Sequence, residues 1–101
     1  MTVFFSNYFQ LLDKKIRSLN ALELVKVSDL VNQANKKNGK IIVIGNGGSA
    51  AIASHASIDF TKAAKIRSIN FNESSLITCL ANDYGYEHWA EKAIDFYTKE
   101  I

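Results

Sequence analysis

The first third of the chain carries apolar residues at helical spacing in two consecutive segments. Apolar side chains recur every three or four positions over Val3–Arg17, which predicts an amphipathic helix with a wide aromatic face. Asn20 followed by Glu23 is a variant of the capping box, and it predicts that a second helix begins here. This helix is expected to reach about Lys37, with Gly39 as the C′ residue that ends it.

Both helices are expected to bury their apolar faces. The face of the first helix consists of Phe4, Phe5, Tyr8, Phe9, Leu11, Leu12 and Ile16. The candidates in the second helix are Leu22, Val25, Leu30, Val31 and Ala34. The aromatic face of the first helix needs a partner to cover it, and another subunit could be that partner.

After the second helix, the pattern changes to short aliphatic runs separated by helical segments. Lys40–Ile44 is a continuous aliphatic run of the kind found in buried parallel strands. A glycine-rich turn follows it, and then a helix from about Ser49 to Ala63. Arg67–Phe71 is the next expected strand. Strands separated by helices pair in parallel through right-handed crossovers, so the expected fold class is α/β, with N-terminal helices followed by βαβ-type units.

The last third of the chain is predicted to be helical with one interruption. The segment 72–75 is an expected turn and helix N-cap, and a helix should run from Leu76 to about Ala81. A break is expected over Asn82–Gly85, before a final helix from about Tyr86 to Lys99. The apolar face of that final helix consists of Trp89, Ala93, Phe96 and Tyr97.

Composition excludes several classes of function. Hydrophobic residues make up 48% and charged residues 22% of the 101 residues, which is typical of a single soluble domain or part of one. The formal net charge is +2 and the lysines are scattered, so we expect neither nucleic-acid binding nor a basic membrane surface. No apolar run is long enough to span a membrane. The single cysteine, Cys79, lies in an apolar run and is expected to be buried, which is consistent with a cytoplasmic protein.

The junction after the first expected strand is the strongest functional signal. Glycines in the segment Gly45–Ser49 allow the backbone to approach a ligand closely, and Ser49 adds a hydroxyl group. Free N–H groups and the dipole at the start of the following helix favour an anion. The loop therefore predicts a phosphate or phosphosugar site, although a glycine turn without a ligand has the same letters.

Two other kinds of phosphate-binding loop have sequence requirements that this loop meets only in part or not at all. A Walker A loop has a lysine after its last glycine, and none follows Gly48. A dinucleotide fingerprint is matched by Gly45, Gly47 and Ala50. That fingerprint is followed about 20 residues later by an acidic residue, but the corresponding region is basic and Glu73 comes late. The dinucleotide interpretation thus remains open but less well supported.

The loop motif Gly-Asn-Gly-Gly-Ser, followed by His55 and Asp59 and then by the segment Cys79–Gly85, resembles the sugar isomerase (SIS) domain family. Within that family the chain is most similar to the phosphoheptose isomerases, which interconvert sedoheptulose 7-phosphate and a heptose 7-phosphate. The resemblance implies a flavodoxin-like parallel sheet and a homotetramer. It also implies a cytoplasmic role in carbohydrate metabolism, in the synthesis of heptose precursors of lipopolysaccharide. It divides the chain into a helical oligomerisation region, 1–38, and the first part of the SIS domain, 39–101.

The resemblance also implies roles for individual residues. His55 occupies the position of a metal-binding histidine, and Asp59 that of a glutamate that acts as the base and also ligates the metal, for which zinc is a candidate. The family pattern places substrate at Asn82 and Asp83, and at the loop residues Asn46, Gly47, Gly48 and Ser49. From spacing alone, His55 and Asp59 share one helix face and would equally form a surface ion pair. The pair Asn82 and Asp83 would likewise serve as a helix-ending turn.

The chain departs from the family pattern in ways that bear on catalysis. Asp59 is one methylene shorter than the family's glutamate, and Ile58 stands at a position that is often acidic. A second serine-rich phosphate loop and a late helix with a Gln and a His have no counterpart, so the chain covers only about the first half of the pattern. We expect this chain alone to be inactive as an isomerase. The alternative function is a non-catalytic SIS module that binds a phosphosugar or a protein, or an inactive fragment.

Overall fold

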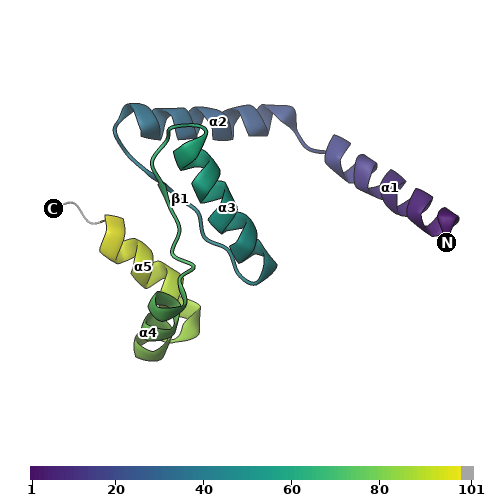
Figure 1. Cartoon of the computed structure of the whole chain (residues 1–101). Coiled ribbons are helices and arrows are strands. Elements are labelled where there is room, and N and C mark those ends of the chain that lie inside the picture. The colour runs from purple at the N-terminus through teal and green to yellow at the C-terminus, as the bar shows by residue number, and fades with distance from the viewer. Residues whose placement is uncertain (99–101) are drawn as a thin grey trace. The chain divides into compact units, whose positions relative to one another are not determined.

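The computed structural model describes residues 1–98, which divide into two compact units, the first Met1–Asn32 and the second beginning at Gln33. The elements follow the order α1 (Thr2–Arg17), α2 (Ala21–Lys36), β1 (Ile41–Ile42), α3 (Gly48–Lys62), β2 (Ser68–Ile69), α4 (Ser74–Tyr84), a 3₁₀ turn (Tyr86–His88) and α5 (Trp89–Thr98) (Figure 1). The expected functional division between 38 and 39 stays a prediction.

The caps of α2 show how the sequence sets its ends. Asn20 Oδ1 accepts a hydrogen bond from the Leu22 N–H at 3.0 Å, so the predicted N-cap is confirmed. At the other end, Asn38 N–H donates to Asn35 O and Gly39 N–H donates to Ala34 O, which is the hydrogen-bond pattern of a Schellman motif. The left-handed residue is therefore Asn38, with φ 57°, and the expectation that Gly39 is the C′ residue is wrong. Asparagine tolerates this conformation better than most residues.

The two N-terminal helices bury none of their residues. The expected aromatic face of α1 is present, and all of its members are exposed. In α2 the prediction of a buried face is wrong for this chain. Its expected members Leu22, Val25 and Leu30 are exposed, and Val31 and Ala34 are only half-buried. The helical period correctly located the apolar residues but could not show whether this chain covers them.

From β1 onward the chain has an interior of its own. β1 and β2 pair in parallel, with Ile41 opposite Ser68 and Ile42 opposite Ile69. The α/β prediction is confirmed, and both strands are shorter than the aliphatic runs that predicted them. The buried residues Phe71, Trp89 and Ala93 form a cluster at the centre of this unit. The hydrophobic residues packed against it are Ile42, Ile44, Ile69, Leu76, Ile77, Leu80, Ala81 and Ala90.

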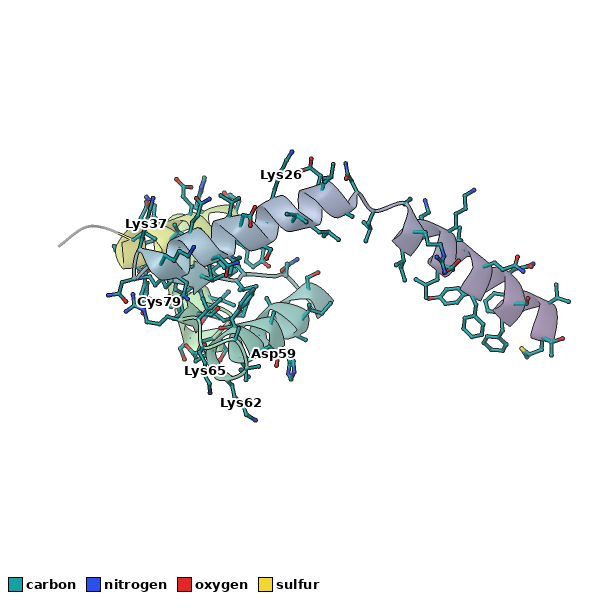
Figure 2. All side chains as sticks on the ribbon, turned by 90° about the horizontal axis from the view of Figure 1, so that it is seen from above. Lys26, Lys37, Asp59, Lys62, Lys65 and Cys79 are labelled. Atoms are coloured by element: carbon teal, nitrogen blue, oxygen red, sulfur yellow. The ribbon has the colours of Figure 1, made fainter. Side chains whose placement is uncertain are left out.

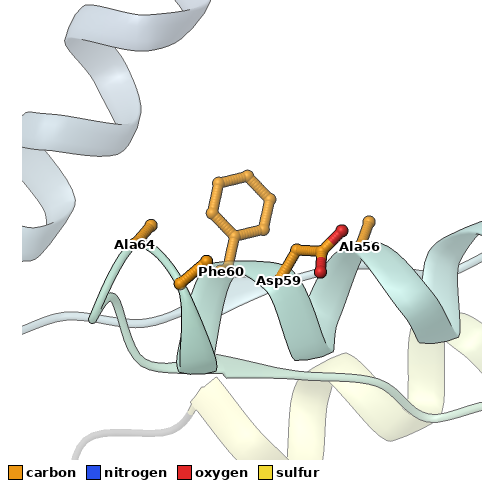
Figure 3. Close-up of a pocket in the computed structure, with 5 residues that line it drawn as sticks. Ala56, Asp59, Phe60 and Ala64 are labelled. Atoms are coloured by element: carbon orange, nitrogen blue, oxygen red, sulfur yellow. The ribbon is translucent and has the colours of Figure 1, made fainter.

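Helices lie on both sides of this small sheet. α3 connects β1 to β2 and contacts β2 through a face that buries Ala53 and Ser57. α4 and α5 contact each other and lie on the opposite side of the strands (Figures 1 and 3). The layering places the β1–α3 junction at one end of the sheet, which is where open α/β folds bind ligands.

The C-terminal helices differ from expectation in three details. α4 continues through Asn82 and Asp83 to Tyr84, so the break begins only at Gly85, where φ is 93°. The final helix begins with a 3₁₀ turn, and its expected end at Lys99 falls outside the described residues. Cys79 is exposed, contrary to expectation, because it lies on the face of α4 that does not pack on the core.

Candidate phosphosugar site

The loop between β1 and α3 requires glycine at two positions for two different reasons. A Cβ added to Gly45 would lie 2.1 Å from the Ser49 carbonyl oxygen, so the backbone at Gly45 packs directly against the first turn of α3. Gly47 has φ 57° and ψ −125°, a conformation that is nearly exclusive to glycine. Both residues thus shape the loop itself.

Gly48 differs from these two glycines, because the fold does not require it. A Cβ at Gly48 would meet nothing within 4 Å, and its φ lies outside the left-handed region. The space above Gly48 is therefore open, and a glycine there keeps it open. Close approach of a ligand to the backbone is the usual reason for such a glycine.

The amides of the loop are partly free. Ser49 N–H donates to Asn46 O at 3.1 Å, and Ala50 N–H donates to Gly47 O at 3.0 Å. Within residues 1–98, the N–H groups of Gly47 and Gly48 have no hydrogen-bond partner. These two donors lie at the start of α3, where the helix dipole favours an anion. The free N–H groups expected at the start of this helix are therefore those of the two glycines, and not those of Ser49 or Ala50.

Side chains from the segment after β2 hold the loop in place. Asn72 Oδ1 accepts from the Gly45 N–H at 3.1 Å, and Asn72 Nδ2 donates to Gly45 O at 2.7 Å. Asn70 Nδ2 donates to Val43 O at 2.7 Å, two residues before Gly45. The hydroxyl of Tyr86 donates to Asn46 Oδ1 at 2.5 Å. Side chains from the part of the chain after β2 therefore hold two successive loop residues, Gly45 and Asn46.

The candidate metal ligands His55 and Asp59 lie further along α3. His55 Nε2 and Asp59 Oδ1 are 3.5 Å apart, and their side chains are 75% and 65% exposed. Asp59 and Lys62 lie in the C-terminal half of the helix (Figure 2). Asp59 borders an open cavity of about 420 Å³ that is otherwise lined by Ala56, Phe60, Ala63 and Ala64 (Figure 3).

Neither Ser49 nor His55 lines this cavity, and a shared ligand for Ser49, His55 and Asp59 stays a prediction. Ten positions separate Ser49 from Asp59, which corresponds to about 15 Å along a helix axis. A ligand that reaches both would have to lie along the helix. Within this chain the loop and the carboxylate are two separate features.

The Asn-Asp pair lies in the last turn of α4. Asn82 Nδ2 donates to Asp83 Oδ1 at 3.2 Å, and both side chains are exposed. Asp83 Oδ2 also accepts from the thiol of Cys79 at 3.8 Å. Both residues remain accessible to a ligand, and their predicted contact with sugar hydroxyl groups stays a prediction.

Comparison with known proteins identifies the family of this chain. A family model described as SIS domain matches residues 4–96. The chain belongs to the SIS domain family. Within residues 4–96 the match includes both N-terminal helices, the glycine loop, His55, Asp59 and the Asn-Asp pair.

Relatives of this SIS domain chain include phosphoheptose isomerases. That of Fusobacterium nucleatum subsp. nucleatum is 34% identical over 83 residues, which cover 77% of this chain and 43% of the relative. That of Cytophaga hutchinsonii is 36% identical over 69 residues, which cover 63% of this chain and 36% of the relative. The solved structure of phosphoheptose isomerase GmhA from Neisseria gonorrhoeae matches with a TM-score of 0.78 and 25% identity, over 97% of this chain and 53% of that one. The chain thus spans about half or less of the length of these relatives.

The donor pair on α3 is compatible with part of a zinc site. Two ligands of a tetrahedral zinc ion, each about 2.1 Å from the metal, lie about 3.4 Å apart. The His55–Asp59 separation of 3.5 Å agrees with this value. Among the described residues, however, no third His, Cys, Asp or Glu joins them. The pair can fill two corners of such a site and would need ligands from elsewhere.

Glu73, the acidic residue that the dinucleotide interpretation would need, has another role in this structure. Both carboxylate oxygens of Glu73 accept hydrogen bonds from the start of α4, at 3.0 Å from the Ser75 N–H and 2.9 Å from the Leu76 N–H. These bonds lower the pKa of Glu73. Glu73 therefore caps a helix and is not available as a ribose acceptor.

Sequence reasoning did not find Asn70, Asn72 or Tyr86. The signal for the asparagines was present: two asparagines two positions apart directly after a strand lie on the same side of the chain. Tyr86 had no local signal, because its partner Asn46 is 40 positions away in the sequence.

Proposed function

We propose that this chain binds a phosphosugar at the Gly45–Ser49 loop and contributes that site to a phosphoheptose isomerase. The substrate class is an aldose or ketose phosphate such as sedoheptulose 7-phosphate. The observation that carries the proposal is the pair of unpartnered amides at Gly47 and Gly48, beside the open space over Gly48. We place the activity in the cytoplasm, in the synthesis of heptose precursors of lipopolysaccharide.

The remaining candidate residues take roles that fit their chemistry. Isomerisation of an aldose and a ketose moves a proton between adjacent carbons, and a carboxylate can act as the base. Asp59 is the proposed base, and Asn82 and Asp83 are proposed to bind sugar hydroxyl groups. His55 and Asp59 would hold zinc where further ligands complete the site, and zinc would then polarise a substrate oxygen.

Binding without turnover by this chain is the second candidate function. It is favoured by the distance along α3 between the loop and Asp59, and by the exposure of the Asp59 carboxylate. Catalysis requires base, acid and phosphate anchor in one geometry, and small misplacements are costly. The assay for conversion of sedoheptulose 7-phosphate, with Asp59→Asn as the paired variant, separates the two candidates.

The binding proposal itself is tested by NMR titration of the 101-residue chain. Sedoheptulose 7-phosphate should shift the amide signals of Gly47 and Gly48 before any others, because those N–H groups are free to donate. Sedoheptulose without phosphate is the control for the anion, and it should shift them far less. Larger shifts with a nicotinamide dinucleotide than with the sugar phosphate would refute the proposal in favour of the dinucleotide interpretation.

A further inference from the structure

The hydrogen-bond ladder between β1 and β2 is continued by side chains where the backbone ladder ends. Ile41 N–H donates to Arg67 O, and Val43 N–H donates to Ile69 O at 3.0 Å. Beyond that point the Asn70 amide bonds the Val43 carbonyl, and the Asn72 amide bonds both backbone groups of Gly45. An asparagine side chain carries one acceptor and two donors, so it can pair with a residue as a neighbouring strand would.

The Asn72 side chain forms hydrogen bonds with both backbone polar groups of Gly45. Within residues 1–98, Asn72 is the only partner of both the N–H and the carbonyl of Gly45, and Gly45 is half-buried. The Asn72 amide is itself oriented by Asn70, whose Oδ1 accepts from the Asn72 N–H at 2.8 Å and whose Nδ2 donates to Asn72 Oδ1 at 3.1 Å. Ser54 Oγ donates to the same Asn70 Oδ1 at 3.3 Å, which ties α3 into the network.

Tyr86 orients the next loop residue. Its hydroxyl donates to Asn46 Oδ1, so the acceptor end of that amide is occupied. Within the described part of the chain, Asn46 Nδ2 has no partner, and its two N–H donors remain free beside the free amides of Gly47 and Gly48. An anion is bound by donors, and it is repelled by a carbonyl oxygen. The orientation that Tyr86 stabilises is therefore the one that suits a phosphate or a sugar oxygen.

We infer that Asn72 and Tyr86 are positioning residues of the phosphosugar site. Asn72 fixes the backbone of Gly45, and Tyr86 fixes the amide of Asn46 with its donors available to the ligand. The effect on ligand affinity rests on the proposed function. The effect on the loop itself does not, because the hydrogen bonds are present without any ligand.

Two variants each change one interaction and nearly keep side-chain size, and Asn72→Asp also adds a negative charge, which its control must match. Asn72→Asp keeps the acceptor for the Gly45 N–H but replaces the donor to Gly45 O by an oxygen, so that two acceptors face each other. Tyr86→Phe removes only the hydroxyl group. Asn35→Asp is the matched control for the first variant, since Asn35 is exposed on α2, and Tyr84→Phe is the matched control for the second, since Tyr84 is an exposed tyrosine two positions away.

Two readouts are measured on the full chain. Hydrogen exchange at Gly45 and amide chemical shifts at Asn46–Gly48 report the loop without ligand. Titration with sedoheptulose 7-phosphate reports affinity. In Asn72→Asp, repulsion between the new carboxylate oxygen and Gly45 O should push the side chain away from Gly45. The Gly45 N–H should then exchange about tenfold faster although an acceptor atom remains in the side chain, and affinity should fall about tenfold or more. In Tyr86→Phe, affinity should fall about three- to tenfold, as expected for one hydrogen bond. Both controls should match the parent chain in both readouts.

The outcomes separate this inference from the proposed function. If the parent chain does not bind the sugar phosphate, the proposed function fails, and exchange at Gly45 still decides whether Asn72 holds the loop. If the parent chain binds and both variants match their controls in exchange, shifts and affinity, the inference is overturned. Because Tyr86 is exposed, Tyr86→Phe remains informative even where Asn72→Asp disturbs folding, which the thermal unfolding midpoint would show.

Discussion

Aromatic residues occur at helical or strand spacing in both units, but only the second unit buries any of them. In α1, Phe4 is 65% and Phe9 is 62% exposed, whereas in the second unit Phe71 is 3% and Trp89 6% exposed. The apolar pattern of the two regions is equally clear in the sequence. The difference lies in whether the same chain supplies a covering surface, as α4 and the sheet do for Trp89. Periodicity therefore identifies an apolar face but not its partner.

The largest effect should come from truncating the core of the second unit. We expect Trp89→Ala to lower the free energy of unfolding by about 3–5 kcal/mol, because it removes a large buried side chain and leaves a cavity. Phe9→Ala, which truncates an exposed aromatic of α1, is the matched control and should change it by less than about 0.5 kcal/mol in dilute protein. Urea unfolding at low protein concentration measures both. Equal losses would contradict the contrast between the units.

A second pair of variants compares two glycines of the loop. Gly45→Ala forces a Cβ toward the Ser49 carbonyl oxygen, so we expect a loss of roughly 2 kcal/mol or more in unfolding free energy. Gly48→Ala meets open space and should change stability by less than about 1 kcal/mol. Gly48→Ala should nevertheless weaken sugar phosphate binding strongly, because its methyl group occupies the space of the ligand. Undiminished affinity in Gly48→Ala would refute the placement of the ligand over this residue.

The exposed face of α1 predicts self-association. An apolar stripe of this size is uncommon on the surface of a monomer, and we propose that a second copy of the chain covers it. Replacing Phe5 and Phe9 by serine should raise the dissociation constant about a hundredfold or more, since each buried aromatic contributes on the order of 1.5–3 kcal/mol. Sedimentation velocity over a range of concentrations measures this, with Lys14→Ser on the same helix as the control. A parent chain that is a compact monomer at micromolar concentration would contradict the proposal.

The sequence predicted those parts of the fold that depend on local pattern. The α/β class, the parallel pairing and the five α-helices in the described residues follow from short-range periodicity and from glycine and asparagine caps. Element ends were less predictable, as Asn38 shows: either Asn38 or Gly39 could take the left-handed position, and the choice depends on which carbonyls the two N–H groups reach.

The candidate site was predictable only where its residues are close in sequence. The loop Gly45–Ser49 was predicted from a local strand–glycine–helix pattern, whereas the roles of His55 and Asp59 were implied by the family resemblance and stay predictions. Asn72 and Tyr86 were missed because their contacts with the loop span 27 and 40 positions. Such contacts depend on how the second βα unit packs against the first, and no local pattern encodes that packing.

The smallest expected effect concerns the cap of α4. The N–H groups of Ser75 and Leu76 donate to the ionised carboxylate of Glu73 and lower its pKa below the ordinary value of about 4.3. A folded-state pKa below the unfolded value means that this contribution to stability is complete above about pH 4.3 and is lost as the pH falls through the lower folded-state pKa. Glu73→Gln should therefore lower the thermal midpoint slightly at pH 7, and the difference from the parent should shrink as the pH falls below about 4.

Asp95→Asn is the control for that variant, because it removes the same charge from an exposed position on α5. It should leave the midpoint near that of the parent at pH 7, since the cap at Glu73 remains. Thermal unfolding followed by circular dichroism at pH 7, 5 and 3.5 provides the comparison. The prediction would be contradicted if the difference in midpoint between Glu73→Gln and the parent grew toward low pH. That trend has the wrong sign for a carboxylate whose pKa is lowered by folding. It would show that the cap does not stabilise α4 through its charge.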